Sequence, residues 1–340
     1  MAPNRPTILV TRRLPDAVEE RMATLFDARF NLADIPLDSE ALVAGLAGAD
    51  VLVSSITDRL DAALIRRLPP TVKLIAQFGN GFDNIDIEAA YAAGLTVTNT
   101  PSVLTEDTAD MAVMLMLALP RRLVEGAQVL PATGTWPGWS PTWMLGRRLR
   151  GKTLGIVGMG RIGAAVATRA HALGLNIQYF SRHRRSPQVE EAIAARNRER
   201  LDDMLADVDI VSLHTPLTRD TLRILGAEQL DRLRPGAFVV NVSRSELIEE
   251  AALIDRIESG HLGGAALDVF DSRGGGVNPR LLALARAHKV LLTAHMASAT
   301  LEARIEMGET VIVNIRAFVD GHQPPHRVLP DGRPVHAPRG

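Results

Sequence analysis

The first hundred residues alternate between short apolar runs, of the length of a buried β-strand, and longer stretches whose apolar residues recur with helical spacing. The apolar runs predict strands at residues 8–11, 51–54, 74–78 and 95–99. The stretches between and after them predict helices at residues 16–25, 39–46, 61–68 and 86–93. Strands that alternate with helices in this way are typical of a parallel sheet covered by helices.

The alternation resumes near residue 153. Further strands, largely apolar as expected when both faces of a parallel sheet are covered, are predicted at residues 175–180, 209–214, 238–242, 264–269 and 290–293. A long helix from Thr105 to about Leu130 is predicted between the two series. A last helix, about Ser298 to Asp320, could pack on either half of the chain, and residues 321–340 are expected to be mostly irregular.

A glycine-rich turn follows a short apolar strand at the start of the second series. Residues 154–157 run directly into Gly158-Met159-Gly160-Arg161-Ile162-Gly163, and residues 164–174 then have helical spacing. Gly158 would permit the tight turn, Gly160 would let the backbone approach a phosphate, and Gly163 would let the helix pack closely on its strand. The helix N-terminus would add free N–H groups and a positive dipole. The pattern predicts a binding site for the pyrophosphate of a dinucleotide.

The residues after the next strand indicate which dinucleotide to expect. NAD sites usually place an Asp or Glu about 20 residues after the first glycines, but no acidic residue occurs between Ala164 and Val189. The strand instead ends in Ser181-Arg182-His183-Arg184-Arg185. Because a guanidinium group binds phosphate bidentately, this cluster favours NADP(H), with Arg182 as the expected contact of the 2′-phosphate. The alternatives are NAD(H) and, for one or two of these arginines, a solvated loop.

An aromatic segment interrupts the pattern of strands and helices between Pro131 and Gly146. All three tryptophans of the chain, Trp136, Trp139 and Trp143, lie here together with two prolines. A buried corner would explain one tryptophan, but three in eight residues favour an extended arm that docks on a second subunit.

Composition narrows the class of protein. The 340 residues predict two domains, each large enough to bury a core. A hydrophobic content of 46% with a net charge of −1 indicates a globular protein that binds neither nucleic acid nor membrane. The chain has no cysteine, no metal-ligand spacing and no apolar signal at its start, so we expect no metal and a cytoplasmic location.

Two polar residues near the ends of later strands are candidates for chemistry. Reduction of a carbonyl by a nicotinamide requires groups that anchor the substrate, polarise its oxygen and supply a proton. Arg244 could hold a carboxylate in a fork, and His295 could donate the proton because its unperturbed pKa lies near neutrality. The structural alternatives are a packing histidine and an Arg244 that pairs with Glu246 or Glu249.

Several ordered motifs carry a family resemblance that covers nearly the whole chain. The sequence resembles the D-isomer-specific 2-hydroxyacid dehydrogenases, and within them the glyoxylate and hydroxypyruvate reductase branch. The motifs are Phe78-Gly79-Asn80-Gly81-Phe82-Asp83-Asn84-Ile85-Asp86, residues 151–163, His214-Thr215-Pro216-Leu217-Thr218, residues 235–244, Ala266-Leu267-Asp268-Val269-Phe270 and residues 293–300.

The resemblance implies an α/β fold of two doubly wound parallel-sheet domains. A flavodoxin-like substrate-binding domain would comprise residues 1–103 and 299–330, followed by a tail at 331–340. A Rossmann domain that binds NAD(P) would comprise residues 104–298, and its arm near 131–146 would cross to the second subunit of a homodimer. The implied reaction is reduction of a small 2-oxo acid, such as glyoxylate or hydroxypyruvate, to a D-2-hydroxy acid.

The resemblance also assigns roles to individual residues. The backbone amides of Asn80 and Gly81 would hold the substrate carboxylate, Arg244 would bind the substrate, His295 would be the acid and base, and Asp268 would accept from the nicotinamide carboxamide. The implied cofactor contacts are Thr108, Gly158, Gly160, Arg161, Ile162, Gly163, Ser181, Arg182, Thr215, Pro216, Thr221, Val242, Ser243, Arg244, Asp268 and His295.

One departure from the family pattern concerns the partner of the catalytic histidine. The family places a Glu five residues after the Asp that corresponds to Asp268, and here that position is Arg273. A carboxylate beside an imidazole favours its protonated form, whereas a cation does the reverse. Smaller departures are Asn80, Ser245, Ala294 and Ala297.

These departures leave three functions open. The leading hypothesis is an NADPH-dependent reductase of small 2-oxo acids. The second is a relative with altered substrate or chemistry, since formate dehydrogenases of the same superfamily also lack that Glu, although they carry Gln there. The third is a cofactor-sensing dimer without catalysis, like the transcriptional corepressors of the family, against which Arg244 and His295 argue.

Overall fold

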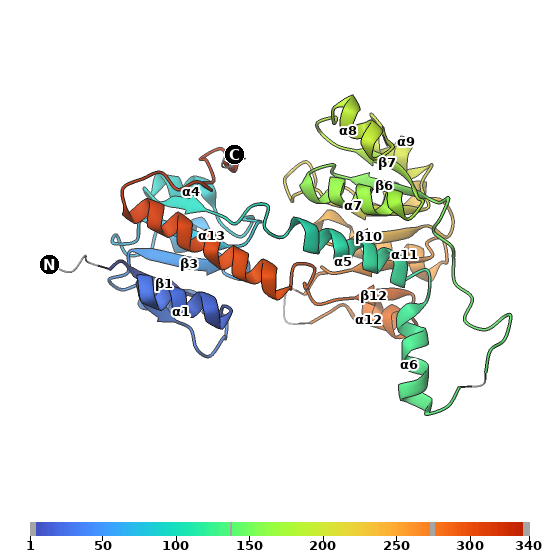
Figure 1. Ribbon diagram of the computed structural model, residues 1–340, viewed down its shortest axis with the longest axis horizontal. Coiled ribbons are helices and arrows are strands. Elements are labelled where there is room, and N and C mark those ends of the chain that lie inside the picture. The colour runs from blue at the N-terminus through green and yellow to red at the C-terminus, as the bar shows by residue number, and fades with distance from the viewer. Residues whose placement is uncertain (1–4, 137, 273–275, 336–340) are drawn as a thin grey trace. The chain divides into compact units, whose positions relative to one another are not determined.

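The computed structural model describes residues 5–136, 138–272 and 276–335. The described chain divides into two compact units, one from Met1–Leu104 with Ala299–Gly340 and one from Thr105–Ser298. Each unit contains one sheet whose strands are all parallel (Figure 1). The predicted α/β fold with two parallel sheets is confirmed.

The sheet of the first unit has five strands in the order β2-β1-β3-β4-β5. This is the flavodoxin-like order, in which the chain winds first to one side of its starting strand and then to the other. The strands are β1 (Thr7–Val10), β2 (Asp27–Phe30), β3 (Val51–Ser55), β4 (Leu74–Phe78) and β5 (Thr96–Thr98).

Successive residues of these strands face two separate cores, as the two-residue period of a strand requires. Leu9, Leu52 and Ile75 face one core together with α2, α3 and α4, whereas Ile8 and Val51 face the other together with α1 and α13. The helices are α1 (Asp16–Leu25), α2 (Ser39–Gly45), α3 (Ala62–Ile65), α4 (Ile87–Ala92) and α13 (Leu301–Val319). Their N-termini are capped where the sequence provides an acceptor, by Asp38, Asp61, Asp86 and Thr300.

The last helix, α13, packs on this first unit. Its Val311, Ile312 and Ile315 are buried in the same core as Val18 of α1. Gly308 makes the close approach possible, because a Cβ atom there would lie 2.4 Å from the Cγ1 atom of Val18. The question that the sequence left open, on which half this helix packs, is thereby answered.

The sheet of the second unit has seven strands in the order β12-β11-β10-β9-β6-β7-β8. The order reverses between β6 and β9, as in a dinucleotide-binding sheet, and ligands of such sheets bind beyond the carboxyl ends of the strands at this point. The strands are β6 (Thr153–Val157), β7 (Asn176–Phe180), β8 (Ala195–Asn197), β9 (Ile210–Leu213), β10 (Phe238–Asn241), β11 (Gly264–Leu267) and β12 (Val290–Leu292).

Helices cover both faces of this sheet. Ile156 and Tyr179 pack with α5 and α7 on one face, while Val157 and Val211 pack with α9 to α12 on the other. The helices are α5 (Thr105–Ala118), α6 (Leu123–Thr133), α7 (Arg161–Ala172), α8 (Pro187–Ala192), α9 (Leu201–Leu205), α10 (Ala227–Arg232), α11 (Glu250–Glu258) and α12 (Pro279–Arg286), with a short 3-10 helix at Ser245–Leu247.

The expected long helix from Thr105 to about Leu130 is wrong. The chain forms two helices, α5 and α6, because the turn between them contains Pro120 and Arg122, whose φ of 54° lies in the left-handed region. α6 also continues through Pro131, where the sequence suggested an interruption, and ends at Thr133.

α6 and the loop after it extend away from the sheet of the second unit (Figure 1). No residue of α6 is buried. The apolar side chains of Leu123 and Leu130 are 61% and 58% exposed, and Trp139 is 79% exposed. The rings of Trp136 and Trp143 lie 6.3 Å apart, centroid to centroid. This unit therefore presents a projecting apolar segment to solvent.

Candidate active site

The glycine-rich turn lies between β6 and α7, at the carboxyl end of the strand beside the point where the strand order reverses. Gly158 has a φ of 96°, and a Cβ atom on it would lie 2.7 Å from the backbone nitrogen of Thr215. A Cβ atom on Gly163 would lie 2.1 Å from the carbonyl oxygen of Gly158. Both positions are therefore restricted to glycine by contacts within the protein, the first with the segment directly after strand β9 and the second with the turn itself.

Gly160 is different, because nothing within 4 Å would touch a Cβ atom there. Its φ of −73° is also open to any residue. Gly160 caps the N-terminus of α7, which receives no hydrogen bond from a capping side chain. The turn thus combines open space with N–H groups of a helix N-terminus, and these features fit the pyrophosphate of a dinucleotide.

The three arginines after β7 have different hydrogen-bond partners. Arg184 forms two hydrogen bonds to Glu190, of 2.9 and 2.8 Å, which together with the Tyr179 hydroxyl lower the pKa of Glu190 to about 2. Arg185 donates from Nε to the carbonyl oxygen of Met159, 2.6 Å away inside the glycine-rich turn. Arg182 is exposed, and its Nε donates to His183 at 3.2 Å. Of the three arginines, Arg182 has no carboxylate or backbone carbonyl as a partner within the described residues.

Hydrogen bonds join the carboxyl ends of β9 and β10. Ser243 donates from Oγ to the carbonyl oxygen of Thr215 at 2.6 Å, and Asn241 donates from Nδ2 to the carbonyl oxygen of Arg244 at 2.8 Å. Arg244 itself donates to the carbonyl oxygen of Ser243 at 2.8 Å. The backbone that carries Arg244 is therefore fixed on both sides of the residue.

The loop after β12 is held by a fully buried carboxylate. Asp268 accepts hydrogen bonds from the Thr293 hydroxyl at 2.6 Å and from the backbone N–H groups of Met296 and Ala297, both at 2.9 Å. His295 lies between these donors, and its own N–H donates to the carbonyl oxygen of Asp268 at 2.9 Å. Its φ of 52° lies in the left-handed region. Such a conformation costs a non-glycine residue on the order of 1–3 kcal/mol, and the bonds to Asp268 hold it in place.

The predicted substrate loop, Asn80 and Gly81, belongs to the first unit. Asn99 donates from Nδ2 to the carbonyl oxygen of Asn80 at 2.8 Å, and Gln77 donates from Nε2 to the carbonyl oxygen of Gly81 at 3.2 Å. The backbone N–H groups of Asn80 and Gly81 donate to no acceptor within the described residues. The loop is thus held through its carbonyl groups, and its amide groups are available to an anion.

Other predicted cofactor contacts belong to the same, second unit. Thr108 is buried in α5, Val242 is buried after β10, and the Thr221 hydroxyl donates to the carbonyl oxygen of Pro216 at 2.7 Å. Arg161 and Ile162 form the first turn of α7, and Ser181 follows β7 directly. Arg273 lies outside the described residues.

His214 is a titratable residue next to the glycine-rich turn. The residue is half-buried, but its Nδ1 atom is shielded from solvent and has no hydrogen-bond partner in the described part of the chain. Its Nε2 atom lies 2.8 Å from the Ser212 hydroxyl. Burial lowers the pKa of His214 to about 3, so the ring is neutral at physiological pH.

The sequence did not single out the residues that hold these loops. Gln77 is fully buried and bonds Ser54, Gly81 and Asn84, while Asn84 bonds the carbonyl oxygens of Ser55 and Asp58. One signal was available, because Gln77 is a polar residue inside an apolar strand, and a buried amide must find partners. No comparable signal marks Arg185.

Two classes of feature are absent from the described ranges. No three side chains of His, Cys, Asp or Glu gather there in a way that could hold a metal ion. None of the helices in those ranges has the length and apolar character needed to cross a membrane.

Comparison with known proteins relates these features to one family. Residues 113–297 match the family described as D-isomer specific 2-hydroxyacid dehydrogenase, NAD binding domain. A glyoxylate reductase of Thermococcus litoralis is 39% identical over 331 residues, which cover 96% of this chain and 98% of the relative.

Solved structures show the same relation over the whole chain. The NADPH-dependent glyoxylate/hydroxypyruvate reductase of Sinorhizobium meliloti, in complex with NADP and malonate, has 32% identity and a TM-score of 0.82, covering 98% of this chain and 99% of that one. A glyoxylate reductase from Paecilomyes thermophila has 32% identity and a TM-score of 0.81, covering 94% and 97%.

Proposed function

This chain belongs to the D-isomer specific 2-hydroxyacid dehydrogenase family, and we propose that it reduces small 2-oxo acids, such as glyoxylate and hydroxypyruvate, to D-2-hydroxy acids with NADPH. The proposal rests on one observation: three candidate functional features lie at the same edge of the second sheet. The glycine-rich turn, Arg244 and His295 follow the carboxyl ends of β6, β10 and β12, the edge at which such sheets bind their ligands.

The reaction requires a bound hydride donor, a group that binds the substrate carboxylate and a group that donates a proton. When bound, the reduced nicotinamide supplies a hydride to the carbonyl carbon of the substrate. Arg244 holds the substrate carboxylate with two parallel N–H groups and draws charge onto the carbonyl oxygen. His295 delivers a proton to that oxygen, so that the carbonyl becomes a hydroxyl group.

The amide groups of Asn80 and Gly81 complete the binding of the substrate carboxylate. Their orientation is fixed before the substrate arrives, because Gln77 and Asn99 hold the carbonyl groups of the same loop. A preorganised donor pair costs little reorganisation when the anion binds.

The loop that carries His295 is held by Asp268, and in the sequence Arg273 occupies the position at which the family has the Glu that partners the histidine. Three donors from residues 293–297 converge on the Asp268 carboxylate, which fixes the loop without the missing Glu. The Glu would also favour the charged imidazole, and this contribution is lost in the present sequence. We therefore expect turnover with an acidic pH optimum, below that of an Arg273→Glu variant.

The preference for NADPH is supported by the different hydrogen-bond partners of the three arginines after β7. Arg184 is engaged by Glu190 and Arg185 by Met159, which leaves the exposed guanidinium of Arg182 for a 2′-phosphate. Glu190 is the first acidic residue after the glycine-rich turn. Its carboxylate already accepts hydrogen bonds from Arg184 and Tyr179, so it is not available to a ribose hydroxyl group.

We further propose that the protein is a homodimer through α6 and the tryptophan segment. The exposed Leu123, Leu130 and Trp139 would be buried against a second copy, as expected of a segment without a core of its own. Trp139→Asp and Leu130→Asp should lower the sedimentation coefficient to that of a monomer. Leu32→Asp is the matched control, because Leu32 is 72% exposed in the first unit, and it should leave the dimer intact.

One experiment tests the central proposal. NADPH and NADH oxidation is followed with a panel of 2-oxo acids for the wild type, His295→Ala and Arg182→Ala. We expect turnover by the wild type, a loss of at least about 100-fold in kcat for His295→Ala, and a fall in the NADPH to NADH ratio for Arg182→Ala. Arg196→Ala, which removes a charge from the neighbouring strand β8, should leave that ratio unchanged.

The outcomes separate the competing functions. Tight NADPH binding without turnover of any acid would refute the reductase and favour a cofactor-sensing dimer. Turnover by His295→Ala equal to that of the wild type would refute the assigned proton donor while leaving the family reaction in place.

A further inference from the structure

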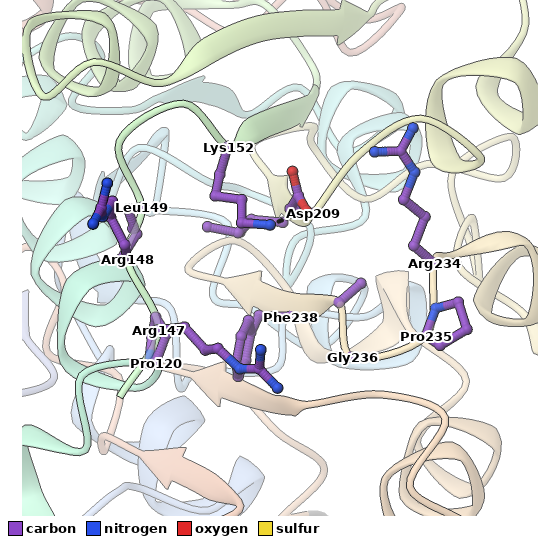
Figure 2. A pocket seen from close by; sticks show the side chains of 12 residues that line it. Pro120, Arg147, Arg148, Leu149, Lys152, Asp209, Arg234, Pro235, Gly236 and Phe238 are labelled. Carbon is purple, nitrogen blue, oxygen red and sulfur yellow. Dashed lines mark hydrogen bonds and ion pairs between the residues drawn. The ribbon is translucent and has the colours of Figure 1, made fainter. Parts of the chain in front are cut away.

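A cavity of about 130 Å³ lies at the amino edge of the second sheet, at the opposite ends of the strands from the glycine-rich turn (Figure 2). It is formed by Pro120 after α5, by residues 147–152 before β6, by Asp209 and Ile210 at β9, and by residues 234–238 before β10. Because β6 has five residues and a strand rises about 3.3 Å per residue, the cavity is roughly 15 Å from the dinucleotide site.

The lining contains four cationic side chains and one carboxylate. The carboxylate, Asp209, is already engaged, since it accepts from Lys152 at 3.0 Å and from the backbone N–H of Thr153 at 2.9 Å. Arg234 donates to the carbonyl oxygen of Ala206 at 3.1 Å and pairs with the Asp207 carboxylate at 3.4 Å. Arg147 and Arg148 are the remaining cations of the lining, so the cavity carries an excess of positive charge.

Arg147 and Arg148 are the lining cations without a partner. Neither side chain has a hydrogen bond or ion pair within the described residues. In Figure 2 Lys152 points to Asp209, and the side chains of Arg147 and Arg234 lie on opposite sides of this pair. Guanidinium and ammonium groups are the side chains that proteins use to bind a small anion.

The walls of the cavity are firmly held. The backbone N–H of Arg147 donates to the carbonyl oxygen of Pro120 at 2.7 Å, and that of Gly236 donates to His261 at 2.7 Å. The turn before β10 is closed by a bond of 2.9 Å from Ala237 to Arg234. A ligand would therefore meet a preformed site, which lowers the cost of binding.

The size of the cavity admits a small anion. A volume of about 130 Å³ is enough for several water molecules and also for a group as small as phosphate. We propose that this cavity binds the phosphate group of a small ligand, either free phosphate or a phosphomonoester, with Arg147 as its main contact and with Arg234 and Lys152 completing the site. The site is separate from the cofactor and does not depend on the proposed reaction.

Calorimetric titration with inorganic phosphate and with glycerol 3-phosphate tests the proposal. Saturating NADP⁺ is present, so that the glycine-rich turn cannot supply the anion site. Arg147→Gln and Arg234→Gln should each weaken phosphate binding at least about tenfold, because a hydrogen bond to a charged group is lost. Arg150→Gln is the matched control on the same loop, since its side chain packs against Gly174 and does not line the cavity. It should change the dissociation constant less than about twofold.

Several results would overturn the proposal. These are the absence of phosphate binding when NADP⁺ is present, equal weakening by Arg150→Gln and Arg147→Gln, and a change of oligomeric state in Arg147→Gln with phosphate binding unchanged. Binding of both anions supports a phosphomonoester as the ligand, whereas binding of inorganic phosphate alone supports free phosphate. Circular dichroism of each variant checks that the fold is retained.

Discussion

Replacing single glycines of the turn between β6 and α7 should separate its two functions, packing and ligand binding. In Gly163→Ala the new Cβ atom would lie 2.1 Å from the carbonyl oxygen of Gly158 and 3.2 Å from the Cγ2 atom of Ile156. Both obstacles lie within β6 and its turn, so α7 must move away from its strand by about 1 Å to restore van der Waals contact. In Gly160→Ala the new Cβ atom meets nothing within 4 Å.

The expected magnitudes differ accordingly. Overpacking of a closely packed contact costs about 1–3 kcal/mol, and a rigid backbone atom places Gly163→Ala at the upper end of that range. Gly160→Ala changes only the residue at a helix N-cap, at a cost of at most about 1 kcal/mol. The same methyl group, however, occupies the space proposed for the pyrophosphate, so Gly160→Ala should weaken NADPH binding at least tenfold, or by about 1.4 kcal/mol.

Urea unfolding followed by far-ultraviolet circular dichroism measures the first quantity, and titration of NADPH fluorescence measures the second. Gly163→Ala should lower the unfolding midpoint and weaken NADPH binding together. Gly160→Ala should keep a midpoint near that of the wild type and still bind NADPH poorly. If Gly160→Ala binds NADPH as tightly as the wild type, the turn is not the pyrophosphate site, and the reasoning fails.

Three further predictions concern stability and catalysis. His214 has a folded pKa of about 3, below its ordinary value of about 6.5, so the unfolded chain binds the proton first and stability falls as pH falls between these values. Between pH 6.5 and 4.5 about 2–3 kcal/mol should be lost, and His214→Gln should flatten this pH dependence of the urea midpoint; an unchanged slope would exclude His214 as its source. Gly308→Ala should lower the melting temperature by several degrees, because its Cβ atom would lie 2.4 Å from Val18, whereas Gly321→Ala, in open space, should lower it only through the strain of its φ of 78°. Arg273→Glu should raise kcat at neutral pH and move the alkaline limb of the pH profile, where His295 loses its proton, to higher pH, and no change in that profile would show that residue 273 does not act on His295.

Buried strands were predictable from the sequence as continuous apolar runs, because both faces of each sheet are covered. The strand at residues 74–78 and the helix at residues 16–25 occur as predicted. The two strands that were missed, β2 and β8, are short, and alternate positions in β2 are exposed, so their hydrophobic signal is weak. The break between α5 and α6 depends on a left-handed Arg122, which hydrophobic spacing does not reveal.

In the candidate site, too, the sequence predicts features of local backbone geometry but not those that depend on tertiary contacts. The glycine-rich turn could be predicted because its glycine spacing follows from backbone geometry. The sequence alone does not determine which arginine is available to a ligand. This depends on the hydrogen bonds from Arg184 to Glu190 and from Arg185 to the carbonyl oxygen of Met159. The left-handed conformation of His295 likewise depends on tertiary hydrogen bonds to Asp268.

The most direct test of the proposed function is the identity of the product formed from hydroxypyruvate. The protein is incubated with hydroxypyruvate and NADPH, and the glycerate is resolved by chiral chromatography while NADPH consumption is followed. The account predicts D-glycerate in an amount equal to the NADPH consumed, and no product from His295→Ala. L-glycerate, or the absence of any product from a protein that binds NADPH, would contradict it.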